Sequence, residues 1–546
     1  MSEGRTGLNR GRIVEGAVFG EACPPSEWDP HDEFVIMRGP FVTSSLAKRA
    51  HSSKCLGVMT PTFVFARRLT QSLLLCLSLP VCLLAQPAPG TPRPALPIKA
   101  PELASFINPI ITAQLDKEKI PGAVFVLVQD RKILYQRGYG FADLEKRKRV
   151  DPFTTIWRIG SISKVFTATA TVQLADRGRF RLTDDVNRYL TRFKVPATYS
   201  EPVRFWHLLT HTAGFDEIRP GTRADTESEL LSLGDFLAPK LVRLRQPGRV
   251  ISYSTYGISL AGYLIEQTSA LGFESYLRQN IWAPLGMRRT NIVVPERLKD
   301  NLAKGYELDN GANRAANWEW YHSTPASSIN STAVDMAQFI IAVLQRGRYE
   351  KTRILSEAAG RDLLRQHFTS HPQLAGFTYG FQEDFTNGEH IVQHGGNVEG
   401  FSAQLTLLPD RGIGFFIASQ HEPAELKDVV QKALLDHYFP DQRKQVPPVP
   451  MVGYRERAAR YAGTYEVNEF CHTCGPGRRA YPRIDVKAFP DGTLSITGIE
   501  PRFVEVSAMF FRKVNGAPGG AVFHQDPAGK IDFVAGDSWL VFERIK

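Results

Sequence analysis

Two kinds of hydrophobic pattern occur between residues 100 and 440. Continuous apolar runs predict strands, and these runs form two pairs, each joined by a short polar turn. Apolar positions spaced near 3.6 residues predict amphipathic helices at both ends of the region. The predicted elements are, in chain order, a helix at Pro101–Lys119, strands at Ala123–Gln129 and Ile133–Gly138, strands at Phe401–Leu408 and Gly412–Ser419, and a helix at Leu426–Tyr438.

The order of these elements predicts the fold class. Strands lie near both ends of the region, and helical patterns fill the space between them. We therefore expect one antiparallel sheet built from both ends of the region, flanked by helices and carrying a helical insertion. This is an α+β arrangement, because the strands and helices do not alternate as βαβ units.

The pattern changes after residue 440. Residues 441–460 are polar and then rich in proline, which is typical of a linker. Residues 461–546 contain short apolar runs separated by turns such as Asp491-Gly492, which predict a small, barrel-like all-β domain. The runs are Ile484–Phe489, Leu494–Ile499, Phe503–Val506, Ala521–His524, Ile531–Val534 and Trp539–Ile545.

The first hundred residues predict export. Residues 1–58 have no periodicity and are interpreted as disordered or as an upstream extension. Residues 59–85 read as a signal peptide that starts at Met59 and is cut after Ala85, because Arg67-Arg68 precede an apolar run of suitable length. Residues 86–100 follow as a linker. The expected location is periplasmic or secreted; a retained segment that anchors the chain to a membrane is the alternative.

Composition adds little to this picture. Hydrophobic residues make up 43% and charged residues 22%, as in ordinary globular proteins. The net charge of +10 is spread out, since residues 1–100 hold 11 Lys and Arg against 7 Asp and Glu. No basic stripe is interleaved with aromatic residues, so no nucleic-acid partner is expected.

The cysteines also suit export. Four of the six lie in the first hundred residues, which leaves Cys471 and Cys474 for the exported chain. The pair is compatible with a redox site, half of a metal site or a local disulfide. A structural disulfide is favoured, because no second cysteine pair completes a zinc site and no βαβ context supports redox chemistry.

Ser161 and Lys164 form the first candidate for chemistry. A serine hydroxyl is a poor nucleophile at neutral pH and needs a base. A helix that begins at Ser161 would place both side chains on one face, with the serine at the N-terminus, where backbone amides favour a developing negative charge. A desolvated lysine can act as the base. The alternative is a capping serine with a solvated lysine, and Ser45 with Lys48 repeats the spacing.

Histidines at zinc-ligand spacing offer a different chemistry. His207 and His211 are four residues apart, but Leu208 stands where a hydrolytic zinc helix has glutamate. Buried structural histidines are therefore expected, and no metal or other cofactor is predicted.

Two later segments carry further candidates. Tyr253 lies on an expected loop and could exchange a proton with Lys164, although a core or surface aromatic is the common role of a tyrosine. His394-Gly395-Gly396-Asn397 precedes the second strand pair, and paired glycines let a substrate approach a strand backbone closely. A bulge or turn is the alternative for this segment.

Five segments in this order resemble the class C β-lactamase and penicillin-binding-protein-like serine hydrolase family. They are Ser161-Ile162-Ser163-Lys164, Leu208-Leu209-Thr210-His211-Thr212-Ala213-Gly214, Tyr253-Ser254-Thr255, Ile281-Trp282-Ala283-Pro284-Leu285-Gly286-Met287 and His394-Gly395-Gly396. Each motif is weak alone, and five in order are specific. The resemblance covers about residues 101–440 and implies a β-lactamase-like fold for that domain. The family includes β-lactamases, D-amino-acid peptidases and esterases.

The resemblance implies an acyl-enzyme mechanism. Ser161 would attack a carbonyl, while Lys164 and Tyr253 share the role of base as a coupled pair. Tyr253 would then protonate the leaving group, and the backbone amides of Ser161 and Asn397 would form the oxyanion hole. His394, at a position where many members have lysine, would bind a substrate carboxylate or orient Tyr253.

Two departures from the family pattern bear on the substrate. Thr255 replaces the usual asparagine that orients lysine and substrate, and His394 is at most partly charged at pH 7. Both favour an esterase or peptidase over an efficient β-lactamase. Thr255 and Gly396 join His394 as expected substrate-binding or orienting residues.

The sequence thus predicts a serine hydrolase that acts on an ester, a D-amino-acid peptide or a lactam. The expected partner is a small-molecule or short-peptide substrate, with a membrane only if the N-terminal segment is not cleaved. The alternative is a non-catalytic protein that binds peptidoglycan peptides, and Thr255 is the feature that favours it.

Overall fold

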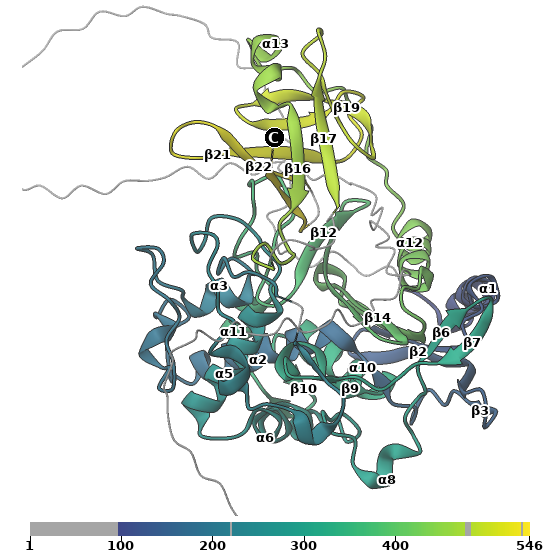
Figure 1. Ribbon diagram of the computed structural model, residues 1–546. Coiled ribbons are helices and arrows are strands. Elements are labelled where there is room, and N and C mark those ends of the chain that lie inside the picture. Colours follow the sequence, from purple (N-terminus) through teal and green to yellow (C-terminus); the bar gives the residue numbers. More distant parts are fainter. Residues whose placement is uncertain (1–96, 219–220, 475–481, 537–538, 546) are drawn as a thin grey trace, which may run out of the picture. The chain divides into compact units, whose positions relative to one another are not determined.

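The computed structural model describes residues 97–218, 221–474, 482–536 and 539–545 (Figure 1). The predicted extension at residues 1–58, the signal peptide at 59–85 and most of the linker at 86–100 lie outside the described residues. Within the described part of the chain, no helix is both long and apolar enough to cross a membrane.

A seven-stranded antiparallel sheet lies at the centre of the larger domain. Its strand order is β12-β13-β14-β15-β1-β2-β3, so strands from the two ends of the region meet where β15 pairs with β1. The strands are β1 (Gly122–Gln129), β2 (Lys132–Asp143), β3 (Lys148–Arg149), β12 (Gln382–Thr386), β13 (Glu389–Val398), β14 (Phe401–Leu408) and β15 (Ile413–Gln420). The predicted α+β fold with an antiparallel sheet is confirmed.

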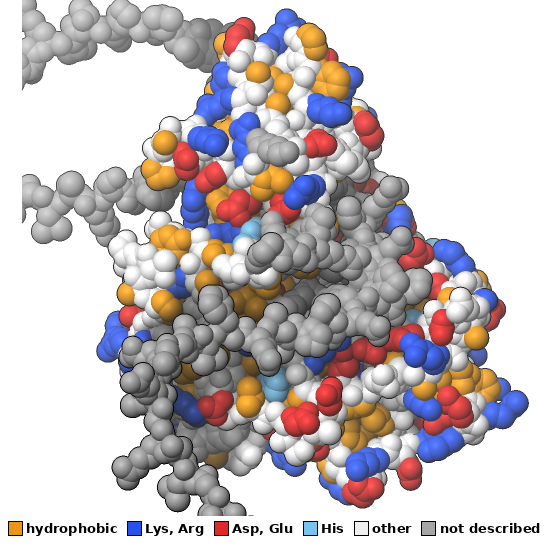
Figure 2. All heavy atoms as spheres, viewed as in Figure 1, with side chains coloured by type: hydrophobic (Ala, Val, Ile, Leu, Met, Phe, Trp, Pro, Cys, Tyr) orange, Lys and Arg blue, Asp and Glu red, His pale blue; other side chains and the backbone are white. Residues whose placement is uncertain are grey.

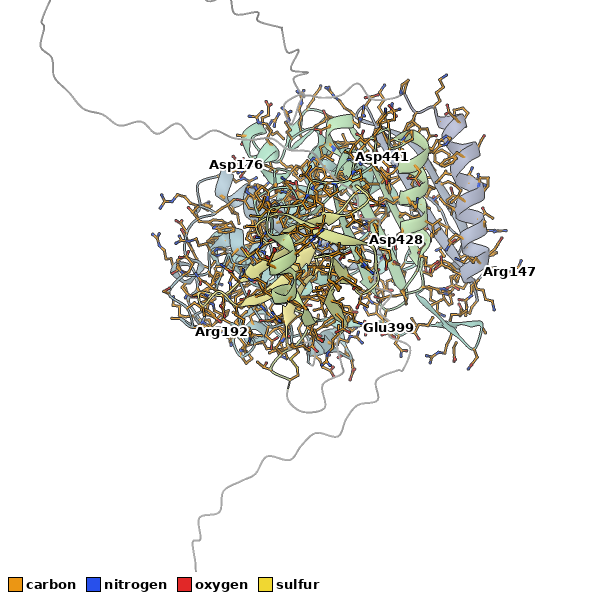
Figure 3. All side chains as sticks on the ribbon, turned by 90° about the horizontal axis from the view of Figure 1, so that it is seen from above. Arg147, Asp176, Arg192, Glu399, Asp428 and Asp441 are labelled. Carbon is orange, nitrogen blue, oxygen red and sulfur yellow. A yellow bond between two sulfur atoms is a disulfide. The ribbon has the colours of Figure 1, made fainter. Side chains whose placement is uncertain are left out.

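Helices cover both faces of this sheet. Because successive strand residues point to opposite faces, Phe125 of β1 packs with α1 and α12 on one side, and Val126 packs with the helical insertion on the other. Helices α1 and α12 lie side by side in Figures 1 and 3. Lys117 of α1 donates a hydrogen bond to Glu425 beside α12, at 3.1 Å.

The insertion is mostly helical. The α-helices of the structure are α1 (Ala100–Glu118), α2 (Ser163–Asp176), α3 (Phe205–Leu209), α4 (Leu233–Leu237), α5 (Thr255–Ser269), α6 (Phe273–Leu277), α7 (Ala283–Leu285), α8 (Glu296–Lys299), α9 (Thr324–Ser327), α10 (Ala333–Leu344), α11 (Glu357–Leu363), α12 (Leu426–Tyr438) and α13 (Tyr454–Arg457). Short helical turns are η1 (Gly160–Ile162), η2 (Val186–Arg188), η3 (Glu227–Glu229), η4 (Arg278–Trp282), η5 (Pro409–Arg411) and η6 (Ala458–Tyr461).

Four small strand pairs complete the larger domain. They are β4 (Trp157–Arg158) with β9 (Asn330–Ser331), β5 (Arg223–Ala224) with β8 (Trp320–Tyr321), β6 (Tyr306–Asp309) with β7 (Ala312–Ala315), and β10 (Arg348–Tyr349) with β11 (Thr352–Arg353). Strand β4 ends at Arg158, shortly before η1, so its pairing with β9 fixes the chain just ahead of Ser161.

The C-terminal domain is a closed barrel in which each strand pairs with its sequence neighbours. Tyr465, Phe503 and Phe523 are buried in its core. The strands are β16 (Gly463–Val467), β17 (Arg483–Ala488), β18 (Leu494–Ile496), β19 (Ile499–Ser507), β20 (Phe510–Lys513), β21 (Gly520–Gln525), β22 (Ile531–Gly536) and β23 (Val541–Arg544). The predicted all-β domain is confirmed, and β16 and β20 are additions to the predicted strands.

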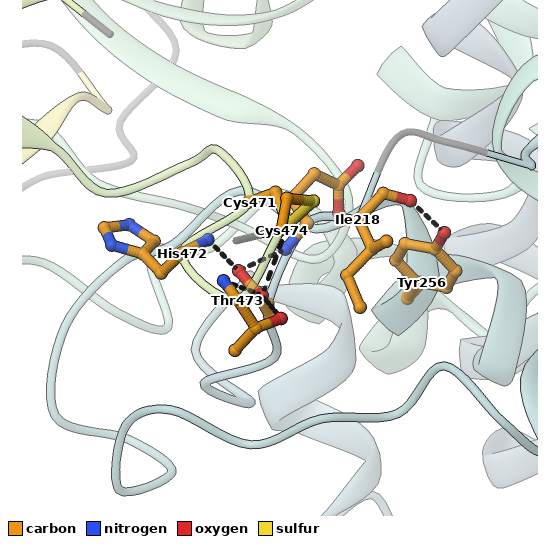
Figure 4. Close-up of a disulfide and its surroundings, with 8 residues drawn as sticks. Ile218, Tyr256, Cys471, His472, Thr473 and Cys474 are labelled. Atoms are coloured by element: carbon orange, nitrogen blue, oxygen red, sulfur yellow. Dashed lines mark hydrogen bonds between the residues drawn. A yellow bond between two sulfur atoms is a disulfide. The ribbon is translucent and has the colours of Figure 1, made fainter. Parts of the chain in front are cut away.

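The predicted disulfide is present between Cys471 and Cys474. Its loop follows β16 and holds Asp216 of the larger domain, whose side chain is fully buried. The Asp216 carboxylate accepts hydrogen bonds from the backbone N–H of His472 at 2.8 Å and from the Thr473 hydroxyl at 2.6 Å (Figure 4). The disulfide loop therefore ties the barrel to the larger domain; both belong to the unit Pro40–Lys546.

The visible surface is mixed in charge. On the face shown in Figure 2, basic and acidic side chains are interspersed, without a continuous patch of one sign. Figure 3 shows Arg147, Asp176 and Arg192 at the periphery of the molecule.

Candidate active site

Ser161 lies in the single turn η1, immediately before α2, and not at the first residue of the helix as the sequence predicted. Gly160 has a φ of +50°, which starts this tight turn. The Ser163 hydroxyl then donates to the Gly160 carbonyl at 2.7 Å and fixes it. Ser161 remains partly exposed, so its hydroxyl can meet a substrate.

Lys164 is fully buried behind the serine. Its Nζ donates hydrogen bonds to Ser161 Oγ at 2.9 Å and to the Ala326 carbonyl of α9 at 3.0 Å. These two acceptors aim the amine at the serine hydroxyl, which is the geometry that a base for this nucleophile needs. The Ala326 contribution was not predicted, because a backbone carbonyl leaves no signature in residue type.

Tyr253 sits beside this pair on the loop before α5. The Lys164 Nζ lies 4.9 Å from the centroid of the Tyr253 ring. The loop is held from both sides, because Ser254 caps α5 by accepting from the Gly257 N–H at 3.1 Å, and the Thr255 N–H donates to Glu217 at 2.9 Å. The structure thus brings Ser161, Lys164 and Tyr253 together, as expected.

His211 packs against the ring of Tyr253. The two rings stack with centroids 4.4 Å apart. Nδ1 of His211 accepts a hydrogen bond from the Ser254 N–H at 3.0 Å, so we assign its proton to Nε2. Burial and the nearby charge of Lys164 hold the pKa of His211 well below its ordinary range. The backbone of His211 has a φ of +55°, a left-handed conformation that the sequence does not reveal.

His207 has a separate role from His211. Its Nδ1 accepts from the Arg204 N–H at 3.0 Å, and burial lowers the pKa of His207 to about 3. Among the residues that the structure describes, no group of three or more His, Cys, Asp or Glu side chains is placed to hold a metal ion.

His394 is a neutral hydrogen-bond acceptor within the site. Its Nδ1 lies 2.6 Å from the Gly395 carbonyl, which can only accept, so Nδ1 carries the proton. Burial, and then the charge of Lys164, lower the pKa of His394 to about 3. Its Nε2 is buried and has no hydrogen-bond partner among the described residues. The side chain therefore offers a lone pair at neutral pH, and no positive charge.

The glycines of β13 let this strand pack directly on η1. A Cβ at Gly396 would lie 2.0 Å from the Ile159 carbonyl oxygen, and a Cβ at Gly160 would lie 2.8 Å from the Asn397 nitrogen. Both contacts are shorter than any real Cβ contact, so only glycine fits at either position. The result places the Asn397 backbone amide against the turn that carries Ser161, where an oxyanion hole is needed.

The side chain of Asn397 is anchored from α12. Its Oδ1 accepts from Lys427 Nζ at 2.6 Å and from the Ser402 hydroxyl at 2.9 Å. Lys427 is buried, and burial lowers its pKa. Lys427 was not predicted as part of the site, because it lies thirty residues from its partner on a helix whose pattern shows only amphipathicity.

Comparison with known proteins shows the family of the chain. The beta-lactamase family model matches residues 107–437. Protein flp of Staphylococcus aureus (strain N315) is 27% identical over 321 residues, which cover 57% of this chain and 62% of that protein. A beta-lactamase of Yersinia enterocolitica is 29% identical over 206 residues, covering 38% of this chain and 51% of that protein. The chain thus spans less than two thirds of the length of these relatives.

Solved structures show the same fold. The octameric penicillin-binding protein homologue from Pyrococcus abyssi has a TM-score of 0.54 and 23% identity, covering 82% of this chain and 100% of that one. A structure titled SurE has a TM-score of 0.56 and 20% identity, covering 80% of this chain and 98% of that one. The chain belongs to the beta-lactamase family, whose members are generally serine hydrolases. The predicted family resemblance is confirmed.

Proposed function

We propose that this protein is a serine hydrolase that works through an acyl-enzyme on Ser161. The observation that carries the proposal is the 2.9 Å hydrogen bond from buried Lys164 to the partly exposed Ser161 hydroxyl, with Tyr253 beside it. A non-catalytic binding protein would have no need of a desolvated amine aimed at this hydroxyl.

In the proposed reaction, Ser161 Oγ attacks the substrate carbonyl as its proton passes to the Lys164–Tyr253 pair. The amides of Ser161 and Asn397 stabilise the oxyanion. Tyr253 returns the proton to the leaving group, the bond between the carbonyl carbon and that group breaks, and an acyl-Ser161 ester remains. Water, deprotonated by the same pair, then hydrolyses this ester and frees Ser161.

Esters, and D-amino-acid peptides without a free carboxylate beside the scissile bond, are the proposed substrates, ahead of lactams. A β-lactam or penicillin-like substrate brings a carboxylate, and a neutral His394 with an unprotonated Nε2 offers that group no positive charge. Of the two predicted roles of His394, we propose the orienting of Tyr253 through ring packing, because the two ring centroids lie 6.2 Å apart.

We further propose that the protein acts after export, in the periplasm or outside the cell. The Cys471–Cys474 disulfide supports this, because such bonds persist in oxidising compartments.

Turnover of three substrate classes tests the function. A p-nitrophenyl ester, a D-alanyl p-nitroanilide and a penicillin are offered to the wild type and to the Lys164→Ala and Tyr253→Phe variants. We expect kcat/KM to rank ester or anilide above penicillin, and to fall by about 10²–10⁴ in both variants. Tyr256→Phe is the matched control, since Tyr256 donates to the Ile218 carbonyl outside the catalytic group. Variants as active as the wild type would contradict the assignment.

A further inference from the structure

The barrel forms hydrogen bonds with the segment that precedes Tyr253. Asn468 of the barrel donates through Nδ2 to the Ile251 carbonyl at 2.9 Å and accepts at its own carbonyl from the Ser252 hydroxyl at 3.1 Å. These two bonds hold the chain one and two residues before Tyr253, so the position of this tyrosine depends on the docked barrel.

Ion pairs extend the same contact. Arg245, which is 5% exposed, pairs with Glu543 of β23 at 2.5 Å, and Arg249 pairs with Asp532 of β22. Such buried or half-buried pairs favour one docked arrangement, because a partner left unpaired in a desolvated setting is costly.

Apolar side chains fill the space between the two domains. Val250 and Ile251 form one buried cluster with Phe377 of the larger domain and with Phe533 and Val541 of the barrel. Trp539, in the connection between β22 and β23, packs against this cluster and remains partly exposed.

The indole of Trp539 lies next to Tyr253, with ring centroids 5.3 Å apart and planes inclined by 44°. His211 stacks on Tyr253 with ring centroids 4.4 Å apart, so the phenol ring packs with residues of both domains. Ser161, Tyr253 and Trp539 are each partly exposed, so a substrate bound beside Tyr253 can contact the indole.

We propose that Trp539 is a specificity-determining residue, through which the barrel supplies the wall against which the leaving group of the substrate packs. This inference rests on the proposed function, because it takes Tyr253 as the group that protonates the leaving alcohol or amine. An indole beside that proton donor favours a leaving group that is aromatic or otherwise apolar. An aromatic pair is stabilised by the apolar area that it buries and, in addition, by the contact between the two rings.

Two acetate esters test the inference. Phenyl acetate and trifluoroethyl acetate give the same acetyl-Ser161, so a difference in kcat/KM between them reports acylation and the leaving group alone. Trp539→Ala is expected to lower kcat/KM for the phenyl ester by about three- to tenfold and to leave the trifluoroethyl ester within about twofold. Trp539→Phe, which keeps an aromatic face, should restore most of the phenyl preference.

Phe489→Ala is the matched control, because Phe489 is a partly buried barrel aromatic that packs against Arg502 of the barrel itself. This variant should leave kcat/KM unchanged for both esters. Trp539→Leu replaces the alanine variant if that protein does not fold. An equal loss on both esters, or no loss, overturns the inference while the wild type remains active. A wild type inactive on both esters overturns the proposed function, and the inference with it.

Discussion

His394 is a neutral histidine in the candidate site. His394 donates through Nδ1 to the Gly395 carbonyl, and its buried Nε2 carries a lone pair directed at no described partner. An asparagine at this position can keep the donation to Gly395 but has no acceptor that reaches the place of Nε2. We expect His394→Asn to lower kcat about tenfold with little change in KM, because the smaller side chain no longer fills the space beside the Tyr253 ring, whose centroid lies 6.2 Å from that of His394. An equal rise in KM would indicate a substrate-binding role instead.

The neutral state of His394 leads to a prediction for the pH profile of kcat/KM. Because the pKa of His394 is about 3, the imidazole stays neutral throughout the range from pH 5 to pH 8. The pH profile of kcat/KM should therefore be the same in this range for the wild type and for His394→Asn, apart from a constant factor. A limb near pH 6.5 that the substitution removes would contradict the neutral assignment.

The two glycines after His394 have different tolerances. Alanine at Gly396 would meet the Ile159 carbonyl and push β13 away from η1, whereas alanine at Gly395 would meet the Gln404 side chain at 3.1 Å and the Ala403 carbonyl oxygen at 4.0 Å. We expect Gly396→Ala to lower kcat by about 10²-fold through the oxyanion hole. Gly395→Ala should keep most of the activity in the same assay. Equal losses would show that the close approach is not what the site requires.

At this scale the sequence reveals side chains but not backbone partners. Ser161, Lys164 and Tyr253 came forward as candidates through their residue types and through the order of five motifs that resembles the family. The Ala326 carbonyl and the Lys427 anchor could not be predicted, because any residue can supply a carbonyl and a helical lysine is usually solvated.

Among the elements, the disulfide loop after β16 makes the most specific connection. Asp216 accepts hydrogen bonds from His472 and Thr473 of this loop while it is fully buried. Asp216→Ala leaves these donors without an acceptor, so we expect the free energy of unfolding to fall by about 2–3 kcal/mol. Asp225→Ala, at an exposed carboxylate, is the control and should be close to neutral in denaturant unfolding. Equal stability of both variants would contradict this role.

Element prediction succeeded where the hydrophobic pattern was strong. The helix at Leu426–Tyr438 and the strand at Phe401–Leu408 have the bounds that the sequence predicted. Two barrel strands were missed: β16, with the sequence Gly-Thr-Tyr-Glu-Val, and β20, with Phe-Phe-Arg-Lys, because neither contains an apolar run long enough to stand out.

For the whole molecule, buried histidines predict sensitivity to acid. Burial lowers the pKa of His207 and His394 to about 3 and that of His421 to about 4, whereas the unfolded chain binds these protons near pH 6.5. Unfolding therefore takes up protons below pH 6.5, and each such histidine lowers the free energy of unfolding by up to about 1.4 kcal/mol per pH unit as the pH falls towards 4.

Glu399 opposes this trend. Burial and the neighbouring Glu319 raise the pKa of Glu399 to about 8, so its contribution weakens the fold as the pH rises from about 4.5 to 8. The His394→Asn variant separates the contribution of His394 to this pH dependence from that of Glu399. Its free energy of unfolding, measured by denaturant titration from pH 6.5 to pH 4.5, should fall less steeply than that of the wild type. Parallel curves would contradict the prediction.

The central claim, that Ser161 is the nucleophile, is tested most directly by intact-mass measurement. Wild type and Ser161→Ala are mixed briefly with p-nitrophenyl acetate and, separately, with a penicillin, and the release of p-nitrophenol is followed in parallel. We predict that the wild type releases p-nitrophenol through an acyl adduct that peptide mapping places on Ser161, and that Ser161→Ala shows neither adduct nor turnover. An adduct or turnover that survives Ser161→Ala would contradict the account.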